Sequence, residues 1–163
     1  MRRGPIQNEE ILNVSGDKLL DASMPAGKME NNAIQLVENI DVQNVEVLVA
    51  ADSTGIKEPW GRLYLDSEDI QHMKAAYLDL GYIWAPTADG TIQLYNLTDG
   101  VTVWESPTFT GGESSERTRF TLDKAKILAG KEYKMRINIT VSGAAGEQAK
   151  ITRALLKIVK GVS

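Results

Sequence analysis

Hydrophobic and polar residues alternate along much of the chain. The clearest case is the segment 133–142, where every second residue is apolar: Tyr133, Met135, Ile137, Ile139 and Val141. A period of two residues is typical of a β-strand that has one buried face and one solvated face. The pattern therefore predicts a strand over this segment.

Similar patterns predict further strands, separated by short segments that contain proline and glycine. They cover residues 18–24, 33–38, 45–50, 62–66, 75–84, 91–97, 101–104, 117–122 and 149–160. About eight strands joined by short turns are typical of two antiparallel sheets packed face to face. The sequence thus predicts an all-β fold, a two-sheet antiparallel sandwich of jelly-roll type.

Two local features refine this fold. Between the strands 91–97 and 101–104 the loop Thr98-Asp99-Gly100 predicts a hairpin, in which Gly100 adopts a positive φ angle. Residues 67–80 fit both helical and strand periodicity. We expect one short helical turn at 67–73, followed by a strand.

Length and composition favour one domain with an arm in front of it. The chain has 163 residues and no cysteine, which excludes disulfides and thiolate metal sites. Residues 1–17 show little pattern and are predicted to form an N-terminal arm, and residues 18–163 a single domain. No signal-peptide pattern and no membrane-spanning apolar run is found, so we expect a virion protein or otherwise a cytoplasmic one.

Charge is distributed unevenly along the chain. The first 80 residues contain 14 acidic and 7 basic residues, whereas the remaining residues contain 8 and 11. Such an asymmetry suits subunits that pack through patches of opposite charge. Alternatively, strands from the two halves interleave in the sandwich and mix the charges. The acidic balance argues against nucleic acid as a partner.

The second half of the chain carries a resemblance to known folds. The segments concerned are 94–100, the loop 110–112, 129–133 and the closing strand. They resemble a jelly-roll pattern of viral and phage capsid or decoration proteins, and are also similar to small carbohydrate-binding sandwiches. The resemblance implies a virion structural protein that self-assembles, with other virion proteins as further partners. It consists of strand and turn residues and bears on fold more than on function.

The sequence contains few residues in arrangements that catalysis requires. His72 is the only histidine, so a Ser-His-Asp triad would have to use it, and no Gly-x-Ser-x-Gly motif is present. We predict no catalytic residue and no cofactor. A small glycan-active enzyme is the least favoured alternative, because nothing selects a carboxylate pair among the acids.

Two other kinds of site have candidate residues. Asp66, Glu68 and Asp69 form an acidic cluster that offers oxygen ligands to calcium, although acids also belong in a first helical turn. The alternative function, a carbohydrate-binding module, would stack sugar rings on tryptophan. Its candidates are Trp60, Trp84 and Trp104.

For the leading hypothesis, contact with copies of the same chain, we expect the interface to use the arm, outward-facing basic residues and surplus apolar residues. The candidates are Arg2, Arg3, Leu48, Lys134, Arg136, Ile151, Leu155 and Val159.

Overall fold

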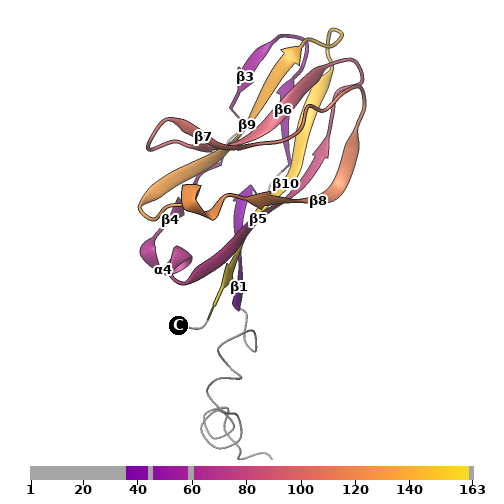
Figure 1. Cartoon of the computed structure of the whole chain (residues 1–163). Helices are drawn as coiled ribbons and strands as arrows, with labels where there is room; N and C mark the ends of the chain where they lie inside the picture. Colours follow the sequence, from indigo (N-terminus) through magenta and orange to yellow (C-terminus); the bar gives the residue numbers. More distant parts are fainter. Residues whose placement is uncertain (1–35, 44–45, 59–60, 162–163) are drawn as a thin grey trace, which may run out of the picture. The chain divides into compact units, whose positions relative to one another are not determined.

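The computed structural model describes residues 36–161 apart from residues 44–45 and 59–60. These residues form two antiparallel sheets of five strands each, and Figure 1 shows how the strands are arranged. The predicted all-β, two-sheet sandwich is therefore confirmed. The predicted strand at 18–24 and the predicted domain start at residue 18 lie outside the described residues. Within the described part, no helix is long and apolar enough to cross a membrane.

The first sheet, called sheet A here, has the order β1-β10-β5-β8, and β2 also pairs with β10. Its strands are β1 (Leu36–Gln43), β2 (Val47–Ala50), β5 (Met73–Ile83), β8 (Ser114–Leu122) and β10 (Gln148–Lys160). β1 and β2 pair with successive parts of β10, so together they form one interrupted edge strand.

The second sheet, sheet B, has the order β3-β9-β6-β7, and β4 also pairs with β9. Its strands are β3 (Gly55–Lys57), β4 (Leu63–Leu65), β6 (Asp89–Asn96), β7 (Val101–Glu105) and β9 (Lys131–Val141). β3 and β4 again form one interrupted edge strand, this time along β9.

This connectivity is that of a jelly roll. When each interrupted edge is counted as one strand, eight strands remain, and their sequence order in the sheets is 1-8-3-6 and 2-7-4-5. The chain thus crosses between the sheets repeatedly, and distant segments become neighbours. The last strand, β10, lies between the first strand and β5.

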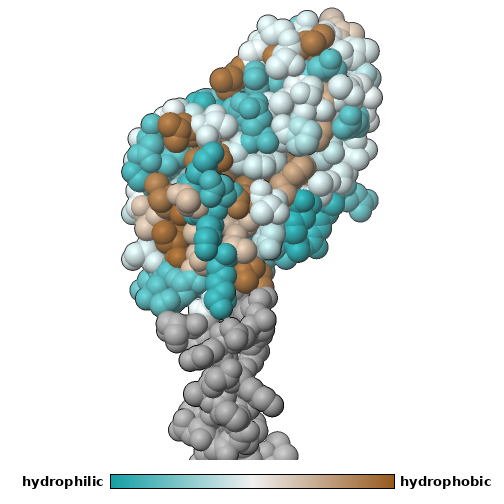
Figure 2. All heavy atoms as spheres, in the orientation of Figure 1, coloured by the Kyte–Doolittle hydropathy of each residue, from teal (hydrophilic) through white to brown (hydrophobic). Residues whose placement is uncertain are grey.

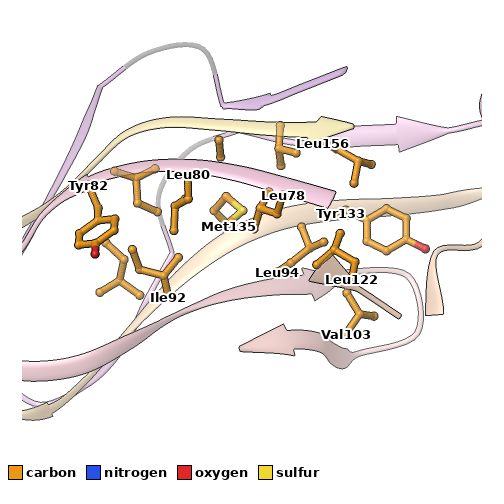
Figure 3. Close-up of a cluster of buried hydrophobic side chains, with 14 of the residues drawn as sticks. Leu78, Leu80, Tyr82, Ile92, Leu94, Val103, Leu122, Tyr133, Met135 and Leu156 are labelled. Carbon is orange, nitrogen blue, oxygen red and sulfur yellow. The ribbon is translucent and has the colours of Figure 1, made fainter. Parts of the chain in front are cut away.

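The core lies between the two sheets and is built by the alternation that the sequence predicted. From β9, Tyr133, Met135, Ile137 and Ile139 are buried, whereas Val141 at the strand end is exposed. From sheet A, Leu78 and Leu80 of β5 meet them across the interface, as Figure 3 shows. The buried inner faces supply the main free energy that holds the sandwich together.

Two local predictions are also confirmed. The short helix α4 (Ser67–Ile70) precedes β5, and Asp66 caps it by accepting hydrogen bonds from the N–H groups of Glu68 and Asp69. The β6–β7 hairpin turns at Gly100, whose φ is 71°. β3 was not predicted, because it has only three residues and its Ile56 faces solvent. A short 3₁₀ helix, η1 (Lys124–Lys126), follows β8.

We predict that Leu80→Ala destabilises the fold by about 3 kcal/mol, because Leu80 is 0% exposed and its removal leaves a cavity between the sheets. Leu48→Ala is the matched control, since Leu48 is 46% exposed and its truncation should cost less than about 1 kcal/mol. Urea denaturation of both variants measures the difference. Equal losses for the two leucines would contradict the assigned inner and outer faces.

Candidate interaction surfaces

The outward face of sheet B carries a group of ion pairs around Glu58. Lys134 Nζ lies 2.5 Å from Glu58 Oε2, and Arg136 Nη2 lies 2.5 Å from Glu58 Oε1. These contacts, with the hydrogen bond from Lys134 first, lower the pKa of Glu58 below its ordinary value. The Arg136 guanidinium also lies 3.2 Å from the centre of the Tyr95 ring, a cation–π contact.

Lys134 and Arg136 therefore lie on the outward face of β9, as predicted, but they are largely covered. Their charges are paired within the chain. Farther across the same sheet, Glu105 accepts hydrogen bonds from Thr91 Oγ1 at 2.6 Å and Gln93 Nε2 at 2.9 Å. Both bonds lower the pKa of Glu105. Most charged groups on this face are thus satisfied by their own neighbours.

The outward face of sheet A is organised around Asp79. Both guanidinium groups of β8 donate to this one carboxylate: Arg117 through Nε at 2.9 Å and Nη2 at 2.5 Å, and Arg119 through Nε at 2.7 Å and Nη2 at 3.0 Å. Lys157 Nζ of β10 lies 3.7 Å from Asp79 Oδ2. Three cations from two neighbouring strands thus converge on one acid.

The acid is buried and the two arginines are not. The Asp79 side chain is 1% exposed, whereas those of Arg117 and Arg119 are 52% and 48% exposed. The hydrogen bonds from Arg119 and then Arg117 lower the pKa of Asp79 to about 2, against the opposing effect of burial. Asp79 is therefore ionised at neutral pH and holds the arginines in place from below.

Two β-bulges shape this face at Gly81. The register of β10 shifts between Ile151 and Arg153, and that of β5 with β8 shifts between Leu80 and Tyr82. A Cβ atom at Gly81 would lie 2.4 Å from Thr152 Oγ1 and 2.7 Å from the Glu116 carbonyl oxygen, so only glycine fits between the two bulges.

One sequence prediction is wrong because of the bulge in β10. Ile151 was predicted to face outward with Leu155 and Val159, but it is fully buried in the core. The extra residue at the bulge shifts the alternation by one position, so residues before and after it face opposite sides. Leu155 opposes Asp79 on the outward face and is buried there, and Val159 is half-buried.

Apolar residues accompany the cations on this face. Leu48 of β2 and Ile83 of β5 are both exposed, and both pair in register with Lys150 of β10, which lies between them. The outward direction predicted for Leu48 is confirmed. Figure 2 shows one side of the molecule, where hydrophobic residues are scattered among hydrophilic ones.

The described tryptophans do not lie where stacking of sugar rings would require them. Trp84 is almost fully buried, its indole N–H donates to the Ala88 carbonyl oxygen at 2.8 Å, and its ring packs against Phe109. Trp104 is half-buried, with its ring centre 4.8 Å from that of Phe120. Trp84 therefore closes the sandwich and offers no surface to a sugar. Trp60, like Arg2 and Arg3, lies outside the described residues.

The acidic cluster serves the cap of α4. Asp66 and Asp69 form a reciprocal capping box, and Lys160 Nζ donates to the Glu68 carbonyl oxygen. Across the parts of the chain that the structure describes, no group of three or more His, Asp or Glu side chains is placed to share a metal ion. His72 is exposed in the following turn, with a φ of 59°.

Asp79 is the residue that the sequence analysis missed. Its signal was present, because an aspartate interrupts the apolar run of residues 75–84 and such an acid is buried only when it is paired. Its partners could not be named, since Arg117 and Arg119 lie about 40 positions away along the chain.

Comparisons with known proteins give a distant likeness. No protein-family model and no curated protein matches the chain. Solved structures that are similar include the Gx and Gt strains of infectious bursal disease virus, at 13% and 14% identity and TM-scores of 0.45 and 0.40. Another is the VP2 subviral particle of that virus, at 16% identity and a TM-score of 0.42.

These matches cover 78–79% of this chain and 32–33% of the other chains, so the chain spans about a third of their length. Likeness at this level concerns the course of the backbone and not the activity.

We predict that Asp79→Asn destabilises the protein by about 2 kcal/mol at neutral pH, because it leaves Arg117, Arg119 and Lys157 without their counter-charge. The pKa of Asp79 is lowered by folding, so its contribution is complete above about pH 4, the ordinary range of an aspartate. It is lost as the pH falls towards 2.

The gap in unfolding free energy between the wild type and Asp79→Asn should therefore narrow below pH 4. Urea denaturation between pH 7 and pH 2.5 measures it. Asp41→Asn is the control on the same face, since Asp41 is exposed. A gap that stays constant over this range would contradict the assigned role of Asp79.

Proposed function

We propose that this chain is a structural subunit of a virion, a capsid or decoration protein that acts by contact with copies of itself and with other virion proteins. It acts through surfaces and not through catalysis. The virion setting is supported by the resemblance of its strand and turn pattern to viral and phage structural proteins. The composition and charge pairing of the two outward faces of the sandwich indicate where the contact surface lies.

The observation that carries the proposal is the composition of the outward face of sheet A. It combines arginine, tyrosine and aliphatic side chains on adjacent strands: Leu48, Tyr77, Ile83, Arg117, Arg119 and Arg153. Arginine, aromatic and aliphatic residues are the types that protein interfaces favour at their centres, whereas aspartate, glutamate and lysine are depleted there.

The two outward faces differ in how far their charged side chains are covered and paired within the chain. On sheet B, Glu58 pairs with Lys134 and Arg136, and those two basic side chains are only 10% and 15% exposed. Exposed apolar residues lie on both faces, Leu48 and Ile83 on sheet A and Ile56 and Tyr64 on sheet B, so they do not distinguish the two. On sheet A, however, Arg117 and Arg119 are 52% and 48% exposed, and they share one carboxylate. Because its cations are less fully covered and paired, we place the contact between copies on sheet A, where burying Leu48 and Ile83 adds free energy.

We predict that Ile83→Asp weakens self-association at least tenfold, because it places a charge in the middle of the proposed contact. Ile83 is 43% exposed, so the variant should stay folded. Ile56→Asp is the matched control: Ile56 is 53% exposed and lies on β3 of the other sheet. Sedimentation velocity and native mass spectrometry of the full chain over a range of concentrations measure association.

Retained association in Ile83→Asp together with loss in Ile56→Asp would move the contact to sheet B. A wild-type chain that stays monomeric at every concentration, alone and with other proteins of the same particle, would refute the proposed function.

A further inference from the structure

We propose that the outward face of sheet A is a receptor for carboxylate side chains of a second copy of this chain. Arg117 and Arg119 of β8, held by the buried Asp79, would receive them, with Lys157 and Arg153 of β10 on the other side of β5. This proposal rests on the proposed function and gives the chemistry of its contact.

The first support is an excess of positive charge around Asp79. Arg117, Arg119 and Lys157 all lie within 4 Å of Asp79, so three positive charges surround one negative charge. Arg153, which opposes Gly81 in register, is exposed and has no ion pair with any residue that the structure describes. Like charges held this close repel one another, and an anion from outside relieves that repulsion.

Acids at the margins of the face do not remove this excess. Asp41 on β1 and Glu116 on β8 are both exposed, and among the described side chains neither forms an ion pair. Asp41 lies on the edge strand β1, and Glu116 lies on the other edge strand, β8, next to Arg117. The face therefore has a group of cations on β8 and β10 around Asp79, and one exposed acid on each edge strand.

The second support is the preorganisation of the two guanidinium groups. Each donates Nε and Nη2 to Asp79, which leaves the edge that carries Nη1 free for a second carboxylate. Arg119 also lies 5.6 Å from the centre of the Tyr77 ring. Because these contacts already restrict the side chains, binding an anion costs little additional conformational entropy.

The third support concerns the group that would occupy this face. The chain itself can supply the carboxylates, because it has 22 acidic residues against 18 basic ones. The densest acidic group in the described part is Asp66, Glu68 and Asp69 at α4, and none of the three forms an ion pair with a described residue. Within one copy this corner cannot reach the arginines. It lies at the beginning of β5, and Asp79 is six residues along that strand, about 20 Å away.

A contact between different surfaces of two identical copies can be repeated from copy to copy. Such heterologous contacts generate rings or extended arrays, which is what a tiling subunit requires. A polyanion such as nucleic acid is a poorer occupant, because the chain carries a net charge of −4.

A charge exchange tests the proposal on the full chain. Arg153→Glu and Glu68→Lys each change an exposed side chain that lacks an ion pair with any described residue, so both variants should fold. We expect each to weaken self-association about tenfold or more, and the double variant, in which the two charges are exchanged, to recover most of the loss. Association should also weaken as sodium chloride is raised.

The matched control is Arg62→Glu, which makes the same change of charge just before β4 of sheet B and should leave association unchanged. Arg62 is exposed and pairs only loosely with Glu132, at 3.5 Å. Sedimentation equilibrium measures all variants, and circular dichroism with thermal unfolding verifies their folding.

The outcomes separate this proposal from the proposed function. If Ile83→Asp abolishes association while Arg153→Glu and Glu68→Lys leave it intact, copies associate through sheet A but not through this charge pair, and the receptor proposal is overturned. If both single variants weaken association and the exchange restores nothing, the second copy's acidic corner is the wrong occupant. Binding of a short oligonucleotide that only Arg153→Glu removes, with self-association unchanged, would assign the face to phosphate instead.

Discussion

The structure depends on burying two apolar sheet faces against each other. Each face alone would expose a row of leucine, isoleucine and aromatic side chains to water. Leu78 and Leu80 of β5 meet Met135 and Ile137 of β9 in one continuous core. Because the inner faces are occupied in this way, every polar or charged residue that alternates with them is directed outward. The functional possibilities of the described residues therefore lie in the two outward faces, the edges and the loops.

Within sheet A, the close packing around Gly81 determines which side chains lie on the outward face. Bulges in β10 and β8 flank this glycine, and no larger residue fits between them. The bulge in β10 keeps Ile151 inward on one side and directs Leu155 and Lys157 outward on the other. Without it, the residues of β10 beyond the bulge would face the opposite side of the sheet. The same distortion that closes the core thus assembles the cations around Asp79.

The two outward faces differ in the balance between acidic and basic side chains. On sheet B, one glutamate serves two basic residues, and Tyr95 covers the Arg136 guanidinium, so the group is close to balanced. On sheet A, one aspartate serves three basic residues, and two of those remain half-exposed. This difference in balance is the reason why we place the contact between copies on sheet A and assign carboxylates to it.

Much of the local structure followed from the order of residues alone. Alternation in residues 133–142, the Gly100 turn and the short helical turn before β5 depend on neighbours in the chain, and short-range sterics and hydrogen bonding decide them. The jelly-roll order of the strands, the phase change at the β10 bulge and the burial of Trp84 depend on which distant strands become neighbours. Asp79 meets Arg119 only because β5 pairs with β8, a contact between residues 40 positions apart. Long-range pairing is set by the free energy of the whole core, so the charged surface became visible only in the folded chain.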